Sequence, residues 1–123
     1  MTELAFFDRV GGQPFFDTLV DRFYEGVETD DVLRAMYPAD LTESRRHLAL
    51  FLAQYWGGPR TYSEERGHPR LRMRHAPFVI DRRARDAWLV HMRAALAQMD
   101  LSDEDRAEFD AYIDMAAFQM RNA

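Results

Sequence analysis

Side chains that can do chemistry are concentrated in one stretch of the chain, residues 57–78, GGPRTYSEERGHPRLRMRHAPF. Five arginines lie between Arg60 and Arg74, against the two acidic residues Glu64 and Glu65. This local positive surplus in an acidic protein suits a discrete anion better than a polymer. His75 stands at the end of the stretch, before Ala-Pro-Phe, where proline imposes an extended exit.

His75 is the strongest candidate metal ligand in the chain. The other histidines, His47, His68 and His91, lack the close paired spacing of a zinc site, and no cysteine is present to complete one. A single neutral imidazole is what haem iron requires, because the porphyrin supplies four in-plane ligands. Neighbouring arginines would match two haem propionates. A solvated or structural histidine is the alternative at this level.

Aromatic side chains with polar tips form a second set of candidates. Tyr24, Tyr37, Tyr55, Tyr112 and Trp88 fall on apolar faces of the predicted helices or at a corner beside them. A buried hydroxyl or indole N–H without a partner costs roughly 1–3 kcal/mol. We therefore expect these tips to meet a polar partner or a ligand.

The elements that position these residues are predicted to be helices. Apolar periodicity locates the helices along the chain. Their starts are marked by candidate caps at Asp30, Asp81 and Ser102 and by the capping-box spacing of Asp40 and Glu43. The expected ranges are about 2–10, 14–28, 31–36, 41–56, 82–99 and 103–121. No strand and no internal repeat is expected, so the fold class is all-α, with residues 57–78 mostly irregular.

Composition narrows the class of protein. A length of 123 residues predicts one domain, residues 1–123. The net charge of −5 argues against nucleic-acid binding, and the absence of lysine removes Schiff-base chemistry. No cysteine, no basic leader and no long apolar run are present, so we expect a cytoplasmic protein without stable membrane insertion.

Five sequence words carry a family resemblance: RFY at 22–24, MYP at 36–38, FLAQYWGGPRTY at 51–62, GHPRLRMRHAPF at 67–78 and DAWL at 86–89. In this order they resemble the group II truncated haemoglobins, the O-type of bacteria. The resemblance implies a two-over-two globin fold, in which the helices before and after residues 57–78 enclose a b-type haem.

The resemblance also implies roles for individual residues. His75 is expected to be the proximal iron ligand, and Tyr24, Tyr37 and Trp88 the distal donors to a diatomic ligand, consistent with the preference of negative oxygen for phenol and indole donors. Ser44 would stand at the distal gate, with apolar Leu48 one turn further along. The remaining expected contacts are Phe51 and Leu52 on the distal wall, Leu71 and Phe78 on the proximal side, and Arg74, Arg72 and Tyr62 near the propionates.

His47 is a departure from the family pattern. Close relatives carry arginine at its position, so His47 would reach a propionate only when protonated. The function implied is reversible binding of dioxygen, nitric oxide or carbon monoxide with slow release, by a monomer or homodimer.

Two other functions compete with this one. A haem-dependent nitric oxide dioxygenase or peroxidase-like enzyme would use the same site with an external reductase, because the chain has no nucleotide-binding glycine motif. A haem-free helical interaction module would instead use the methionine and aromatic stripes.

Overall fold

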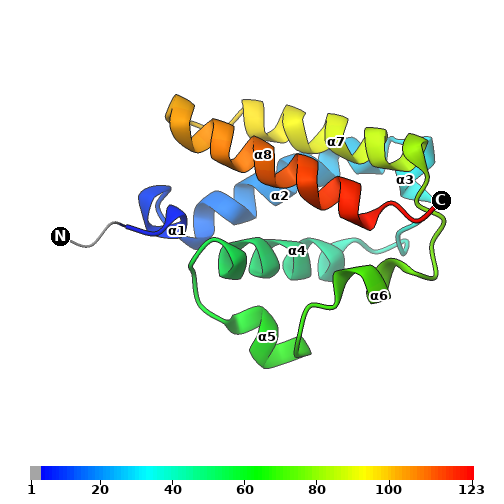
Figure 1. Ribbon diagram of the computed structural model, residues 1–123, viewed down its shortest axis with the longest axis horizontal. Helices are drawn as coiled ribbons and strands as arrows, with labels where there is room; N and C mark the ends of the chain where they lie inside the picture. Colours follow the sequence, from blue (N-terminus) through cyan, green and yellow to red (C-terminus); the bar gives the residue numbers. More distant parts are fainter. Residues whose placement is uncertain (1–3) are drawn as a thin grey trace.

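The computed structural model describes residues 4–123, and within that range every regular element is helical (Figure 1). The all-α prediction is therefore confirmed. The elements are α1 (Phe6–Arg9), α2 (Gln13–Glu28), α3 (Asp31–Arg34), α4 (Thr42–Tyr55), α5 (Thr61–Arg66), α6 (Leu71–His75), α7 (Arg82–Ala97) and α8 (Asp103–Met120).

Four long helices form two packed pairs. Helix α2 packs against α4, α7 packs against α8, and α2 also packs against α7, which joins the pairs (Figure 1). The short α3 lies against α2 and α7, α5 lies against α4, and α6 lies against α8. This is the predicted two-over-two arrangement. None of the helices in residues 4–123 is both long and apolar enough to cross a membrane.

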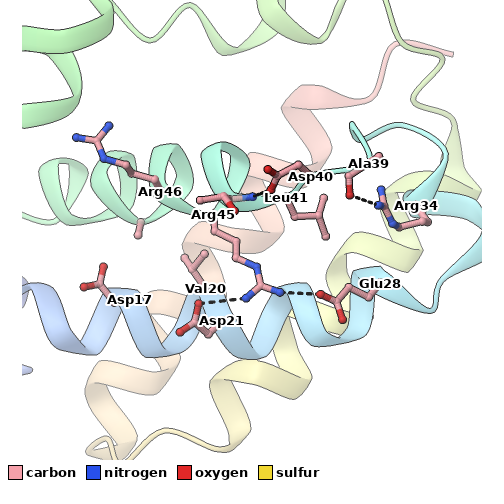
Figure 2. A pocket seen from close by; sticks show the side chains of 12 residues that line it. Asp17, Val20, Asp21, Glu28, Arg34, Ala39, Asp40, Leu41, Arg45 and Arg46 are labelled. Carbon is pink, nitrogen blue, oxygen red and sulfur yellow. Dashed lines mark hydrogen bonds and ion pairs between the residues drawn. The ribbon is translucent and has the colours of Figure 1, made fainter.

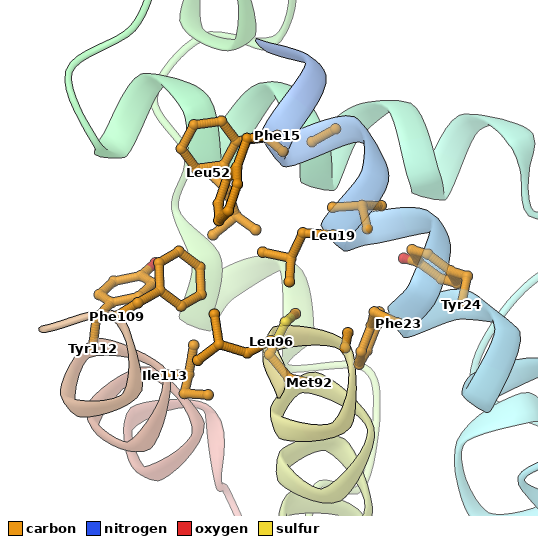
Figure 3. Close-up of a cluster of buried hydrophobic side chains, with 14 of the residues drawn as sticks. Phe15, Leu19, Phe23, Tyr24, Leu52, Met92, Leu96, Phe109, Tyr112 and Ile113 are labelled. Carbon is orange, nitrogen blue, oxygen red and sulfur yellow. The ribbon is translucent and has the colours of Figure 1, made fainter. Parts of the chain in front are cut away.

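The core lies where the four long helices meet, and apolar periodicity explains their contributions (Figure 3). Helix α2 places Phe16, Leu19 and Phe23 there with no exposed surface, and Met92 of α7 and Ile113 of α8 are equally buried. Each such side chain contributes about 1.5–3 kcal/mol relative to exposure.

Side-chain caps begin three of the helices as predicted. Asp30 Oδ1 accepts from the backbone N–H groups of Val32 and Leu33 at 2.8 and 3.0 Å. Asp81 accepts from Ala84 N, and the Ser102 hydroxyl accepts from Asp105 N. Each satisfies a donor that has no partner inside its helix. At α4 Asp40 accepts from the N–H of Thr42, although the residue in the N-cap position is Leu41.

Two expectations were wrong. Residues 57–78 are not mostly irregular, because α5 and α6 lie within them; helices this short carry too few turns for an apolar period. Tyr55 is not inward-facing but half exposed, and Trp56 packs on Phe6 and Phe109 instead.

The N-terminal helix is shorter than predicted. Of the expected range 2–10, residues 6–9 are helical, while residues 2 and 3 lie outside the described part of the chain.

Truncation of Leu19 tests the core directly. Leu19→Ala should reduce the free energy of unfolding by about 2–5 kcal/mol, because the cavity it leaves has rigid walls. The matched control is Val90→Ala on the exposed side of α7, where 63% of the residue is accessible and the change should stay within about 0.5 kcal/mol. Urea unfolding followed by circular dichroism measures both. Equal losses in the two variants would contradict this core.

Candidate functional site

A cavity of about 380 Å³ lies between the two helix pairs. This volume is within the range of roughly 300–1,000 Å³ typical of small-molecule and cofactor sites. Apolar and aromatic side chains form most of its wall. The structure brings to it all but one of the site residues expected from sequence, namely Tyr24, Tyr37, Ser44, His47, Leu48, Phe51, Leu52, Tyr62, Leu71, Arg74, His75, Phe78 and Trp88.

Arg72 is the exception. It is exposed and lines a different hollow beside Met73 and Asn122. Because α6 is helical, Arg72 and Arg74, which are two residues apart, point to different sides of the helix. The expected role of Arg72 at the cavity is therefore not supported.

Three elements bring aromatic donors to the cavity. Tyr24 comes from α2, Tyr37 follows α3, and Trp88 comes from α7. The rings of Tyr24 and Tyr37 meet edge to face with centroids 5.5 Å apart, and Trp88 lies edge-on to Phe23 at 5.7 Å. These ring contacts restrict the orientations of Tyr24, Tyr37 and Trp88 in the cavity wall.

Tyr24 and Tyr37 remain protonated at neutral pH. Burial raises the pKa of Tyr24 far above its ordinary value, and the neighbouring Tyr37 raises it further. Burial also raises the pKa of Tyr37, although a hydrogen bond with Tyr24 acts in the opposite direction. The phenol groups are therefore available as O–H donors.

The orientation of His75 is set by a backbone contact. Its Nδ1 lies 2.6 Å from the carbonyl oxygen of Leu71, one turn earlier in α6. A carbonyl oxygen only accepts hydrogen bonds, so Nδ1 carries the proton. In the neutral ring Nε2 then keeps a lone pair, which is the state of a metal-binding imidazole.

The guanidinium of Arg74 is held by the backbone at the cavity edge. Its Nε donates to the carbonyl of Pro69 at 2.8 Å and its Nη2 to the carbonyl of Arg66 at 3.2 Å. The α5–α6 connection therefore fixes a cation beside His75.

His47 and Arg66 form a pair that sequence reasoning missed. Arg66 Nη1 lies 3.2 Å from the ring nitrogens of His47, and its guanidinium lies over the Tyr62 ring. Burial lowers the pKa of His47, and the charge of Arg66 lowers it further. His47 is thus neutral at pH 7, and Arg66 is the cation at this position. The clue in the sequence was the local surplus of positive charge from five arginines, but the pairing of Arg66 with His47 needed the fold.

A separate, charged hollow lies outside the cavity, between α2 and α4 (Figure 2). Arg45 bridges the two helices there, with Nη2 2.8 Å from Glu28 and Nη1 3.7 Å from Asp21. Its guanidinium carbon also lies 5.8 Å from the centre of the Tyr24 ring, on which it exerts a cation–π attraction. Arg45 therefore supports Tyr24 from outside the cavity.

Several cavity residues were not singled out in the sequence as site residues. They carry ordinary core side chains or isolated charges, and only the packing of α3, α7 and α8 brings them to one wall: Leu33, Met36, Pro38, Ile80, Ala84, Arg85, Ala116, Ala117 and Met120. No group of three or more His, Cys, Asp or Glu residues within residues 4–123 could hold a metal ion. A metal at His75 would need its other ligands from a cofactor.

The fold and this cavity define a globin. The family model of the bacterial-like globins matches residues 5–122 of the chain. The chain is 42% identical over 111 residues to a group 2 truncated hemoglobin of Bacillus subtilis, an alignment that covers 90% of this chain and 84% of that relative. The chain therefore belongs to the bacterial-like globins, and within them to the group II truncated haemoglobins.

Solved structures agree with this assignment. A hemoglobin from the thermophilic phototrophic bacterium Chloroflexus aurantiacus has a TM-score of 0.96 and 51% identity, covering 98% of this chain and all 100% of that one. The truncated oxygen-avid haemoglobin from Bacillus subtilis has a TM-score of 0.91 and 40% identity, covering 97% and 100%.

The family implies a haem cofactor and binding of diatomic gases at it. The residues present fit that group. The cavity wall is largely apolar, His75 offers a free Nε2, and a backbone-held arginine stands at the edge.

Removal of the Arg66 charge tests the His47 pair. Arg66→Gln should raise the pKa of His47 toward its ordinary value, since a nearby cation disfavours the imidazolium. NMR titration of the imidazole signals in haem-free protein measures the midpoint. Arg83→Gln, an exposed arginine on α7, is the control and should leave the midpoint unchanged. A midpoint that falls or stays constant in Arg66→Gln would contradict the contact.

Proposed function

We propose that this chain binds dioxygen, and also nitric oxide or carbon monoxide, reversibly at a b-type haem ligated by His75. The observation that carries this proposal is the hydrogen bond of His75 Nδ1 to Leu71, which leaves Nε2 free in a cavity that also contains phenol and indole donors. When bound, ferrous haem supplies an iron atom that coordinates a diatomic gas.

The proposed propionate partners are Arg74 and Tyr62 of the cavity wall and Arg66, which contacts the wall residues His47 and Tyr62. Arg74 and Tyr62 keep the propionate contacts expected from sequence. Arg66 takes the propionate contact expected of His47, because His47 is uncharged. A guanidinium is a suitable partner because it stays protonated at any physiological pH and can bind a carboxylate through two N–H groups.

The proposed distal donors are Tyr24, Tyr37 and Trp88. Ser44 and Leu48 of α4 line the same cavity, but Leu48 offers no hydrogen bond, so stabilisation of the gas falls on the phenol and indole groups. Hydrogen bonds are stronger in an apolar cavity than in water. Slow ligand release follows, and the similar B. subtilis structure is described as oxygen-avid.

Reconstitution with haem tests the proximal assignment. The unmodified chain should acquire an intense Soret absorption band, whereas His75→Gly should bind haem weakly and recover the band when imidazole is added. His68→Ala is the control, because His68 is exposed and does not line the cavity. Absence of a Soret band from the unmodified chain would rule out the haem function, and a His75→Gly spectrum identical to it would rule out this ligand.

Loss of one donor tests the distal assignment. Trp88→Phe should speed dioxygen dissociation by roughly tenfold, because it removes one hydrogen bond to a partly charged ligand, worth about 1.5 kcal/mol. Flash photolysis and stopped-flow mixing measure the rate. Tyr55→Phe removes a hydroxyl from a residue outside the cavity wall and should leave the rate unchanged. Constant rates in both Trp88→Phe and Tyr24→Phe would contradict the distal role.

A further inference from the structure

A contact outside the cavity joins α7 to α3, close to two of the cavity donors. His91 Nε2 lies 2.6 Å from Asp30 Oδ2, and both side chains are mostly buried. His91 is on α7 and Asp30 is the N-cap residue of α3. Neither lines the cavity.

Asp30 uses its two carboxylate oxygens for different purposes. Oδ1 accepts from the first backbone N–H groups of α3, while Oδ2 contacts His91. One side chain therefore begins α3 and ties its first turn to α7. The pKa of Asp30 is lowered, first by its hydrogen bond with His91, so the carboxylate is charged at neutral pH.

Gly26 of α2 makes room for the imidazole. A Cβ atom at this position would lie 2.2 Å from His91 Nδ1 and 2.8 Å from Cγ, closer than real Cβ atoms approach their neighbours. The ring of His91 therefore lies directly on the α2 backbone. We call Gly26, Asp30 and His91 the latch.

The latch residues and the cavity donors lie on the same three segments of the chain. Gly26 comes two residues after Tyr24 in α2, Asp30 comes seven before Tyr37, and His91 comes three after Trp88, one turn along α7. Each segment thus contributes one donor to the cavity and one member to the latch.

Beyond α3, the path to Tyr37 is also fixed. Arg34 donates to the carbonyl oxygens of Pro38 and Ala39 at 2.9 and 2.8 Å, with a longer contact to that of Tyr37. A displacement of the first turn of α3 therefore also displaces Tyr37, because the short helix and the hydrogen-bonded turn after it connect the two rigidly.

We propose that His91 is a positioning residue, which through Asp30 sets the placement of Tyr37 relative to Trp88 and thereby the rate of gas release. This inference rests on the proposed function. His91 acts without touching the ligand, because it lies outside the cavity wall.

The first experiment compares His91→Ala with His91→Gln. The alanine variant should release dioxygen roughly three- to thirtyfold faster than the unmodified protein, the range expected for mutations that act through an intermediate element. It should also shift the stretching frequency of bound carbon monoxide, which responds to nearby donors. The glutamine variant keeps an N–H that can reach Asp30, so both values should return toward those of the unmodified protein. Val90→Ala is the control on the exposed face of α7.

A double variant separates positioning from stability. With the imidazole removed, Gly26→Ala fits the vacated space and strengthens α2 as a helix. His91→Ala combined with Gly26→Ala should therefore recover thermal stability while dioxygen release stays fast. Recovery of both together would show that His91 is only structural, and unchanged release and frequency in His91→Ala would also overturn the proposal.

Hydrogen exchange gives a readout that needs no haem. In haem-free protein, His91→Ala should speed exchange of the Leu33 amide, because α3 loses its tie to α7. Unchanged exchange overturns the latch, whatever the haem spectra show. Absence of a Soret band from the unmodified protein would refute the proposed function and leave the exchange result to decide on the latch.

Discussion

The contact of α2 with both α4 and α7 is the interaction on which the rest of the structure depends. One helix serves both layers, so its buried face holds the two pairs together and sets their separation. Phe16, Leu19 and Phe23 anchor that face in the core, and Tyr24 of the same helix reaches the cavity wall. Side chains that line an apolar cavity lose van der Waals contacts, because no atoms face them across the empty space. The densely packed core offsets this loss of contact energy. An apolar ligand bound in the cavity would stabilise the fold.

The cavity wall is largely apolar, and three of its polar groups, those of His75, Tyr24 and Tyr37, have a defined state. Hydrogen bonding to the Leu71 carbonyl fixes the tautomer of His75, and burial keeps Tyr24 and Tyr37 protonated. In apolar surroundings such groups bind a ligand strongly, and they destabilise the protein when they are left without a hydrogen-bond partner. Their supports lie outside the wall, in the charge of Arg45 against Tyr24 and in the latch behind α3.

Sequence reasoning succeeded where local rules decide. The caps at Asp30, Asp81 and Ser102 need only short side chains and nearby N–H groups, and the long helices have enough turns to show an apolar period. It failed for α5 and α6, which are too short for a period. It also misplaced Arg72, because a one-turn helix has too few neighbours to reveal which way each arginine points.

The chain alone determined the fold class, the long helices and the set of residues from which a haem site could be built, because periodicity, caps and several family words are local properties of the sequence. Only the tertiary structure decided which of these residues share a cavity, that Arg66 carries the charge beside a neutral His47, and that His91 meets Asp30. These pairings join residues 19 and 61 positions apart. Helix packing determines them, and no local pattern encodes it.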